Sequence, residues 1–361
     1  MFRIWREIRV ERAFSKKNSL SVQEKISFAV VGCGHIGKRH AEMIVRNDEA
    51  ELVGLCDVKD RSELALDSYD APFFNEINDL LELKPDVLCV CTPNGLHAGN
   101  SLSGLNAGSH VLCEKPMALT NADCEKVIHV ALNKAKQVFC VKQNRYSPPS
   151  VWIKDVIDRN LMGDIYMVQI NCYWNRDDRY YKSGGWKGKQ EMDGGTLFTQ
   201  FSHFVDILYW LFGDIHDIKA DFRDFNHTNS TDFEDSGIVT FKLEDGGMGS
   251  LNYSTSVWDA NMESSLTIIG EKGSVKIGGQ YMNEVVHCNI EGYEMPELEA
   301  AGPANDYGAY KGSAANHHFV IQNVVDTLRG RKTIATNAME GMKVVEIIER
   351  IYGLRNPEVL K

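Results

Sequence analysis

Residues 26–37 read ISFAVVGCGHIG, and this stretch decides the fold of the first half of the chain. Its apolar start predicts a buried strand, which breaks into the spacing G-x-G-x-x-G at Gly32, Gly34 and Gly37. In a strand-turn-helix of this kind the first glycine permits the turn, the second lets the backbone approach a pyrophosphate, and the third lets the helix pack on the strand. The free N–H groups around His35 and Ile36 are then the predicted diphosphate site.

The next strand predicts which dinucleotide binds. The apolar run 51–56 ends in Asp57, 20 residues after Gly37. A carboxylate at this distance accepts hydrogen bonds from both ribose hydroxyls and repels a 2′-phosphate, so it favours NAD over NADP. Lys59 and Arg61 lie close enough to weaken that preference. An ordinary strand-turn-helix without a ligand is the alternative interpretation, because glycine-rich turns are common.

Composition limits the class of protein. The 361 residues suggest two domains, and the formal net charge of −11 gives no basic surface for nucleic acid or for an anionic membrane. No apolar run approaches the ~20 residues that a membrane span needs. The nine cysteines are scattered, most of them in apolar runs, which predicts free thiols in a reducing, cytoplasmic setting. Residues 1–25 carry seven Lys/Arg and three Glu and form an extension to which we assign no function.

Strand-like and helix-like segments alternate from residue 26 to 147. We expect strands at 26–31, 51–56, 86–91, 110–113 and 138–142, and helices at 36–47, 61–68, 96–107 and 120–135. This order predicts an α/β domain with a parallel, Rossmann-type sheet. In such sheets ligands bind beyond the carboxyl ends of the strands, so the residues that follow each strand are the candidate binding residues.

Polar residues follow three of these strands and should converge at one edge of the sheet. They are Thr92, Pro93, Asn94 and His97 after 86–91; Glu114 and Lys115 after 110–113; and Gln143, Asn144, Arg145 and Tyr146 after 138–142. A lysine among apolar strand ends loses part of its hydration, which lowers its pKa and suits it to exchange protons with a hydroxyl. Lys115 is therefore the first catalytic candidate.

A second domain is expected over 148–361. Pro148 and Pro149 predict the start of a helix near 150–160, followed by a strand at 164–174. The loop 175–195 is too long and too rich in charged and aromatic residues for a simple connector, so it should bind a ligand. Alternating runs then predict an antiparallel sheet, and two helices, about 316–329 and 337–353, end the chain. The alternating runs lie at 215–225, 235–243, 248–256, 264–269 and 274–277, and residues 281–313 receive no assignment.

The segment 197–212 predicts an amphipathic helix whose polar stripe contains Thr199, His203 and Asp206. A solvated polar face is the alternative interpretation. Trp210 shares the stripe, however, which indicates that this face is covered or borders a cleft. The adjacent His317 and His318 begin the first of the terminal helices, and we expect no metal site there because two ligands are too few.

Several of these motifs together resemble one family. GCGHIG (32–37), Asp57, CTPNGLH (91–97) and above all CEKP (113–116) are similar to the glucose-fructose oxidoreductase/inositol dehydrogenase (Gfo/Idh/MocA) family, from residue 26 to the C-terminus. The resemblance implies an N-terminal Rossmann domain and a C-terminal α+β domain on a large, mostly antiparallel open sheet. It also implies a homodimer or homotetramer joined through that sheet.

The resemblance also implies roles for single residues. Lys115 is the family's proton-exchanging lysine, and His203 aligns with its second catalytic residue, which Asp206 would orient. Thr92, Pro93, Asn94 and His97 would line the nicotinamide and its phosphates, together with Glu114 and Gln143. His97 is equally well explained as a histidine that caps a helix.

One position departs from the family. Many members have Asp four residues before the histidine, whereas this chain has Thr199, followed by Gln200. A neutral hydroxyl cannot act as a general base, so proton transfer should rest on Lys115 and His203. The departure argues against simple polyol dehydrogenases and favours the subgroup that oxidises nucleotide-linked sugars, including UDP-N-acetylglucosaminuronate 3-oxidases.

Those oxidases also resemble this chain around QNRY (143–146) and YYKSGGWKG (180–188). The expected substrate contacts are Asn144, Arg145, Tyr146, Trp186, Lys187, Thr199, Gln200 and His203, and Arg145, Lys182 and Lys187 are the candidates for the anionic groups of the substrate. An ordinary surface lysine is the more common alternative for Lys182 and for Lys187. The resulting hypothesis is an NAD-dependent oxidoreductase acting on a secondary hydroxyl of a nucleotide-linked amino sugar or its uronate, with 2-oxoglutarate as a co-substrate that regenerates NAD. A glycosidase of the same fold, a simple sugar or inositol dehydrogenase, and a non-catalytic sensor are the alternatives.

Overall fold

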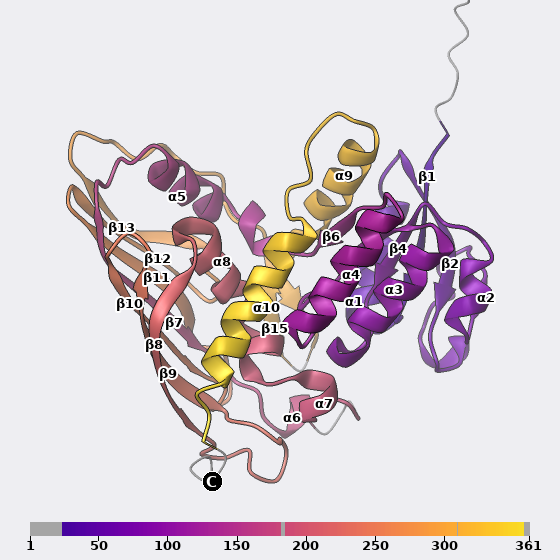
Figure 1. Ribbon diagram of the computed structural model, residues 1–361, viewed down its shortest axis with the longest axis horizontal. Coiled ribbons are helices and arrows are strands. Elements are labelled where there is room, and N and C mark those ends of the chain that lie inside the picture. The colour runs from indigo at the N-terminus through magenta and orange to yellow at the C-terminus, as the bar shows by residue number, and fades with distance from the viewer. Residues whose placement is uncertain (1–23, 182–184, 309, 357–361) are drawn as a thin grey trace, which may run out of the picture.

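The computed structural model describes residues 24–181, 185–308 and 310–356. Most of the predicted N-terminal extension, and Lys182, lie outside these residues. The first half contains a six-stranded parallel sheet in the order β3-β2-β1-β4-β5-β6 (Figure 1). Its strands are β1 (Ile26–Val31), β2 (Ala50–Cys56), β3 (Phe73–Phe74), β4 (Val87–Val90), β5 (His110–Cys113) and β6 (Val138–Cys140). The predicted Rossmann-type sheet is therefore confirmed, and it gains the short β3 at one edge.

Helices connect these strands and cover the sheet. They are α1 (His35–Val45), α2 (Ile77–Leu81), α3 (His97–Ala107) and α4 (Asn121–Asn133). The Thr120 hydroxyl accepts the Asp123 N–H and so begins α4. The predicted helix at 61–68 is wrong, because only a single 3₁₀ turn, Arg61–Glu63, forms there. The Arg61 guanidinium donates to the carbonyl oxygens of Tyr69 and Ala71, which folds this segment back as a loop.

The second half contains a seven-stranded sheet in the order β13-β12-β11-β7-β10-β9-β8. β7 and β10 pair in parallel, and every other neighbouring pair is antiparallel. The strands are β7 (Ile165–Tyr173), β8 (Ile215–Arg223), β9 (Ser236–Leu243), β10 (Met248–Ser254), β11 (Glu263–Gly270), β12 (Gly273–Gly278) and β13 (Glu284–Ile290). Burial alternates along β9, as expected for a sheet with one covered face. The mostly antiparallel sheet is confirmed.

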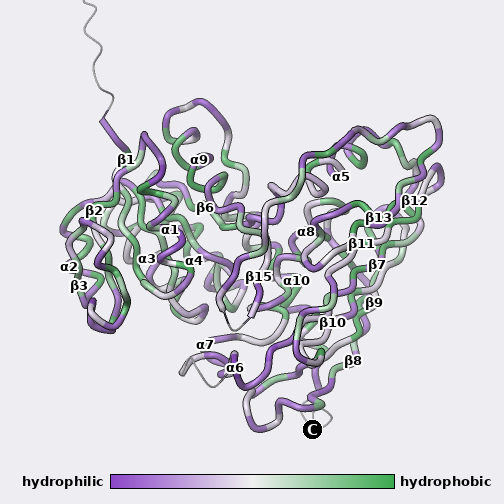
Figure 2. The backbone as a smooth tube through the Cα atoms, turned by 180° about the vertical axis from the view of Figure 1, so that it is seen from behind, coloured by the Kyte–Doolittle hydropathy of each residue, from purple (hydrophilic) through white to green (hydrophobic). Residues whose placement is uncertain are grey.

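Two helices cover the inner face of this sheet, α5 (Pro148–Asp158) and α8 (Ser202–Phe212) (Figure 1). A π-helical turn, Leu197–Phe201, precedes α8, so the predicted helix 197–212 is not one regular α-helix. The predicted binding loop contains the short helices α6 (Asp178–Tyr181) and α7 (Gln190–Asp193), and the backbone around them is mostly hydrophilic (Figure 2). The stretch 281–313, left unassigned above, contains β13 and most of a hairpin, β14 (Ala304–Asp306) and β15 (Lys311–Ala314).

The last two helices connect the halves. α9 (His317–Leu328) packs on α1, and its side chains Val320, Ile321 and Val324 belong to the same apolar cluster as β1. α10 (Ala338–Tyr352) lies between α4 and α8 (Figure 1). The C-terminal part of the chain thus returns to the N-terminal sheet and holds the two sheets in one arrangement.

All nine cysteines are free and eight are buried, in agreement with the predicted free thiols. Among the described residues, none of the helices has the length and apolar character needed to cross a bilayer.

Candidate active site

The glycine turn between β1 and α1 has the shape that the motif predicts. Gly32 has φ +87°, and a Cβ atom there would lie 2.6 Å from the Cys91 carbonyl group. A Cβ on Gly37 would lie 1.9 Å from the Gly32 oxygen, so only glycine lets α1 approach the turn. A Cβ on Gly34, in contrast, would have no neighbour within 4 Å. This open space at the start of α1, where His35 and Ile36 supply the first N–H groups, fits a diphosphate.

Asp57 lies beside this turn. Its carboxylate accepts the Cys33 N–H at 2.7 Å and the Lys59 N–H at 3.0 Å, so the end of β2 is joined to the glycine turn. The Arg61 guanidinium donates to the main-chain oxygens of Tyr69 and Ala71. Because these bonds occupy its N–H groups, Arg61 is poorly placed to bind a 2′-phosphate. The carboxylate position favours NAD.

The loop after β4 connects to two other parts of the site. The His97 ring faces the Pro116 oxygen at 2.6 Å and the Thr92 oxygen at 2.8 Å, so it ties this loop to the turn after Lys115. The Asn94 amide donates to the Asp193 oxygen and to the Thr199 hydroxyl in the second half. For the half-buried Thr92 and Pro93, and for Asn94 and His97, the contact with the nicotinamide stays a prediction.

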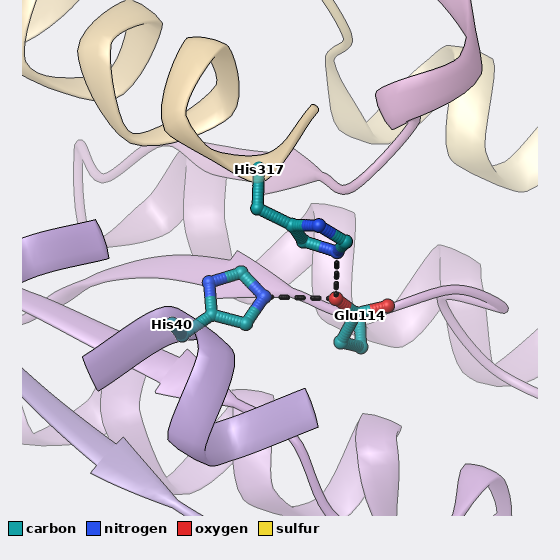
Figure 3. A group of neighbouring side chains, drawn as sticks. All are labelled: His40, Glu114 and His317. Atoms are coloured by element: carbon teal, nitrogen blue, oxygen red, sulfur yellow. Dashed lines mark hydrogen bonds and ion pairs between the residues drawn. The ribbon is translucent and has the colours of Figure 1, made fainter. Parts of the chain in front are cut away.

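Glu114 is buried between two histidines (Figure 3). Its Oε1 lies 2.8 Å from His40 Nε2, on α1, and 3.6 Å from His317 Nε2, at the start of α9. The pKa of Glu114 is held well below its usual range, because the hydrogen bonds and charges of the two histidines outweigh the cost of its burial. The three side chains thus fix the segment that carries Lys115. The short contact between His40 and Glu114 is explained by a hydrogen bond. That no metal binds here, and that Glu114 contacts the cofactor, stay predictions.

The Lys115 side chain reaches the second half of the chain. Its amine donates to the Thr199 main-chain oxygen at 2.6 Å, and the Lys115–Pro116 peptide bond is cis. Burial lowers the pKa of Lys115 to about 8. An amine with this pKa is a suitable general base for a hydroxyl near neutral pH.

His203 lies on the first turn of α8 and is buried. Burial, and then the positive charges of Lys115 and Lys142, hold its pKa well below the usual range, so the ring is neutral. Its Nδ1 has no hydrogen-bond partner among the described residues. The Lys115 amine binds Thr199, in the turn that leads into α8, so it reaches the segment that carries His203 although the two catalytic candidates come from different halves of the chain.

Asp206 does not orient His203, contrary to the prediction. Its carboxylate binds the Arg145 guanidinium through two hydrogen bonds, at 2.7 and 2.9 Å, and lies 3.7 Å from the Lys142 amine. Arg145 also donates to Glu340 on α10, at 2.7 Å. Burying the Arg145 guanidinium without an anion would cost free energy, whereas a neutral histidine needs no charged partner. Asp206 therefore pairs with Arg145. Arg145, with two carboxylate partners, joins α8 to α10 and is poorly placed as the predicted binder of a substrate anion.

The rest of the QNRY turn is also packed. Gln143 and Asn144 are buried, and the side-chain oxygen of Asn144, Oδ1, accepts a hydrogen bond from the Ser313 hydroxyl. The Tyr146 ring stacks on Phe319, with 5.6 Å between the centroids. Gln143 Oε1 and Asn144 Nδ2 have no partner among the described residues, so both side chains still offer a hydrogen bond to a ligand.

Two cations on the loop after β7 have no carboxylate partner within the described residues. Arg176 is 2% exposed and donates only to neutral oxygens, those of Gln200 at 2.8 Å, Asn261 at 3.1 Å and Lys311 at 3.0 Å among them. The amine of Lys187 lies over the Tyr180 ring, 3.9 Å from its centroid. Burial, and then the charge of Arg176, lower the pKa of Lys187 to about 8. Trp186, its neighbour, is half-buried.

A row of rings connects these cations to the glycine turn. His35 contacts Tyr307 at 5.4 Å, Tyr307 contacts Tyr310 at 5.1 Å, and Tyr310 contacts Tyr180 at 4.9 Å. We call His35, Tyr307, Tyr310 and Tyr180 the aromatic row. It gives the site a surface on which a flat ring can stack.

Sequence reasoning missed Asp193, Arg176 and Lys142. Each lies next to a motif that was noticed: Asp193 precedes Gly194-Gly195, Arg176 follows β7, and Lys142 precedes QNRY. Asp193 is buried, and its carboxylate accepts from the Thr199 hydroxyl. Arg176 and Asp193 lie inside the loop 175–195 that the sequence predicts to bind a ligand, and Lys142 directly precedes QNRY, so a charge in or beside a predicted binding segment was the available signal.

Comparison with known proteins agrees with this arrangement. The profile of the oxidoreductase family Gfo/Idh/MocA, with its NAD-binding Rossmann fold, matches residues 26–142, and the Gfo/Idh/MocA C-terminal domain matches residues 151–276. The D-glucoside 3-dehydrogenase of Escherichia coli is 25% identical over 356 residues, which cover 92% of this chain and 96% of that protein.

Two solved structures are more similar in sequence. The WlbA dehydrogenase of Bordetella pertussis, in complex with NADH and UDP-GlcNAcA, is 33% identical, with a TM-score of 0.80 over 92% of this chain and 96% of that one. The WlbA dehydrogenase of Chromobacterium violaceum, with the same two ligands, is also 33% identical, with a TM-score of 0.81 over 92% of this chain and 94% of that one.

Proposed function

This chain belongs to the Gfo/Idh/MocA family of NAD-dependent sugar oxidoreductases, and from that premise we propose that its substrate is a nucleotide-linked amino-sugar uronate, oxidised at the C3 hydroxyl. The observation that carries the proposal is the pair Arg176, which is buried, and Lys187, which is half-buried: neither forms an ion pair with a carboxylate among the described residues. Buried cations are costly unless an anion pairs with them, so the site is suited to an anionic ligand.

The chemistry of the ligand follows from the neighbours of these cations. A uronate supplies a carboxylate and a nucleotide supplies a diphosphate, and either group can pair with Lys187. The aromatic row beside them can stack a uracil ring. The WlbA dehydrogenases, whose structures contain NADH and UDP-GlcNAcA, support this choice because they are similar over nearly the whole chain.

Each catalytic candidate has a proposed role. Lys115, as a neutral amine, accepts the proton of the C3 hydroxyl, while the neutral His203 hydrogen-bonds the same oxygen and orients it. Bound NAD supplies the hydride acceptor. The Thr199 oxygen holds the Lys115 amine at the boundary of the two halves, so the base is in position before the sugar arrives.

Isotope transfer tests the proposed substrate and carbon. The full chain with NAD and UDP-N-acetylglucosaminuronate carrying deuterium at C3 should form deuterated NADH, seen by mass spectrometry and by the near-ultraviolet absorbance of reduced nicotinamide. UDP-N-acetylglucosamine and free inositol are the controls, and 2-oxoglutarate is added in a parallel series to reveal recycled NAD. Equal rates with inositol, or release of a sugar without NADH, would contradict the proposal.

The assembly is part of the same proposal. The outer face of the second sheet exposes Ile238, Met248 and Val286, and covering such a face is a common reason for association. We expect a homodimer or homotetramer through this face. Light scattering on the wild type and on Ile238→Lys, which places a charge on the same face, should give a smaller particle for the variant.

A further inference from the structure

We propose that Asp193 is a positioning residue for the reaction: its carboxylate, at the end of α7, acts on Lys115 through Thr199. The inference rests on the role of Lys115 in the proposed function. It also revises the expectation that a carboxylate is missing from this site.

The Asp193 carboxylate is fixed on both oxygens. Oδ1 accepts from the Thr199 hydroxyl, and Oδ2 accepts the Gly188 N–H at 2.8 Å. The side chain is 1% exposed. A buried carboxylate with two fixed donors has one position, and here that position is beside residue 199.

Thr199 transmits this position to Lys115. Its hydroxyl meets Asp193 and accepts the Asn94 amide at 2.7 Å, while its main-chain oxygen accepts the Lys115 amine at 2.6 Å. The hydroxyl and the main-chain oxygen of Thr199 both belong to the π-helical turn Leu197–Phe201, so they move together. A side chain at position 193 that cannot bind the Thr199 hydroxyl would therefore free the oxygen that holds the base.

The charge of Asp193 also acts on the base. The ionisable groups that face Lys115 are Glu114 and Asp193, which favour its protonated form, and Lys142, Arg176 and His203. Asp193 in turn faces Lys115 and Lys187, and burial raises its pKa to about 6, so it is ionised in the range where Lys115 titrates. When the hydroxyl proton reaches the Lys115 amine and the hydride leaves for NAD, Asp193 stabilises the new ammonium and takes no proton itself.

Replacement of Asp193 by Asn should keep the fold. The Asn oxygen can accept the Gly188 N–H and its amide can donate to the Thr199 hydroxyl, which can turn to the Asp193 main-chain oxygen, 3.0 Å away. Only the charge is lost. The matched control is Asp232→Asn, since Asp232 is exposed and binds the Gln190 N–H at the start of the same helix.

The test measures the titration of Lys115 without any sugar. The full chain is labelled with a trace of acetic anhydride at a series of pH values, and mass spectrometry follows the peptide that contains Lys115. Its reaction rate reports the neutral amine. We expect a midpoint near pH 8 for the wild type and for Asp232→Asn, and a midpoint lower by about half a unit or more for Asp193→Asn. The double variant Asp193→Asn with Thr199→Asp should return the midpoint toward the wild-type value.

An unchanged midpoint in Asp193→Asn would overturn the inference, as would a double variant that fails to restore it. If circular dichroism shows that Asp193→Asn is unfolded, the labelling midpoint of Lys115 is measured in Asp193→Ser instead. That variant also removes the charge, leaves room for a water, and should show the same lowered midpoint. Should the wild type oxidise no sugar, the proposed function fails while the midpoint still decides the role of Asp193. In an active enzyme the Asn variant should lower kcat by about threefold for each half unit by which the midpoint falls, because the base is weaker, and leave the KM for NAD unchanged.

Discussion

The amine of Lys115 donates a hydrogen bond to the main-chain oxygen of Thr199, at 2.6 Å, and so joins the parallel sheet to the helix that carries His203. The two catalytic candidates thus depend on one contact between the halves of the chain. Burial in this contact also lowers the pKa of Lys115, which connects its position to its chemistry.

The first prediction concerns pH. Lys115 must be neutral to accept a proton, and its pKa is lowered to about 8, so kcat for sugar oxidation should rise with pH through about 8. Because the pKa of Lys187 is also lowered to about 8, kcat/KM should fall again at higher pH, where the free enzyme loses the cation that binds the substrate. In the reverse direction, where the ammonium donates, the rate should fall over the same range. Steady-state rates in both directions between pH 6 and 10 check this, and a profile with the same sign in both directions would exclude Lys115 as the titrating group.

The second prediction concerns substrate charge. Lys187→Met removes a cation that has no carboxylate partner among the described residues, so it should raise the KM for the UDP-linked uronate by about 10- to 100-fold, the value of one charge-assisted hydrogen bond. Lys189→Met, two residues further on and exposed, is the matched control. An equal KM in both variants would mean that Lys187 does not meet the substrate.

The third prediction separates two glycines of one turn. Gly34→Ala has free space for its methyl group, so the free energy of unfolding should stay within about 1 kcal/mol of the wild type while NAD binding weakens. Gly37→Ala places a methyl group against the Gly32 oxygen and should cost about 3 kcal/mol. Urea unfolding and NADH fluorescence titration measure the two effects, and full NAD affinity in Gly34→Ala would place the diphosphate elsewhere.

The fourth prediction concerns Glu114, the buried carboxylate that directly precedes Lys115. His40→Leu removes the hydrogen bond to Glu114, so it should lower the free energy of unfolding by about 3 kcal/mol. Arg331→Met breaks the ion pairs of the exposed Arg331 with Glu49 and Asp326 and should cost clearly less, because solvent screens such pairs. Equal losses in the two variants, measured by urea unfolding, would show that the Glu114 pair contributes no more than a surface pair does.

Much of the first half could be predicted from the sequence, for a physical reason. Parallel strands are buried on both faces, so β1, β4 and β5 read as short continuous apolar runs between polar turns. The glycine spacing needs no long-range information either, because its three roles are local. The wrong helix at 61–68 shows the limit, since one arginine bonded to distant carbonyl oxygens decides that segment.

The parts of the site that were missed depend on contacts between distant segments. Asp206 lies three residues after His203, yet its partner is Arg145, 61 residues away. The π-helical turn at Leu197–Phe201 also breaks the helical period on which the polar stripe was based. Asp193 and Arg176 lie in the predicted binding loop but could not be singled out there, because neither belongs to a periodic segment and only folding places them near Lys115.

The most direct test of the central claim is one single-turnover experiment on the full chain. Wild type and Lys115→Met are each mixed with NAD and UDP-N-acetylglucosaminuronate, and NADH is followed by absorbance and its binding by fluorescence. If Lys115 is the base, the wild type should form NADH, and Lys115→Met should form it about 10²- to 10⁴-fold more slowly with NADH affinity unchanged. Wild-type rates in Lys115→Met would contradict that role.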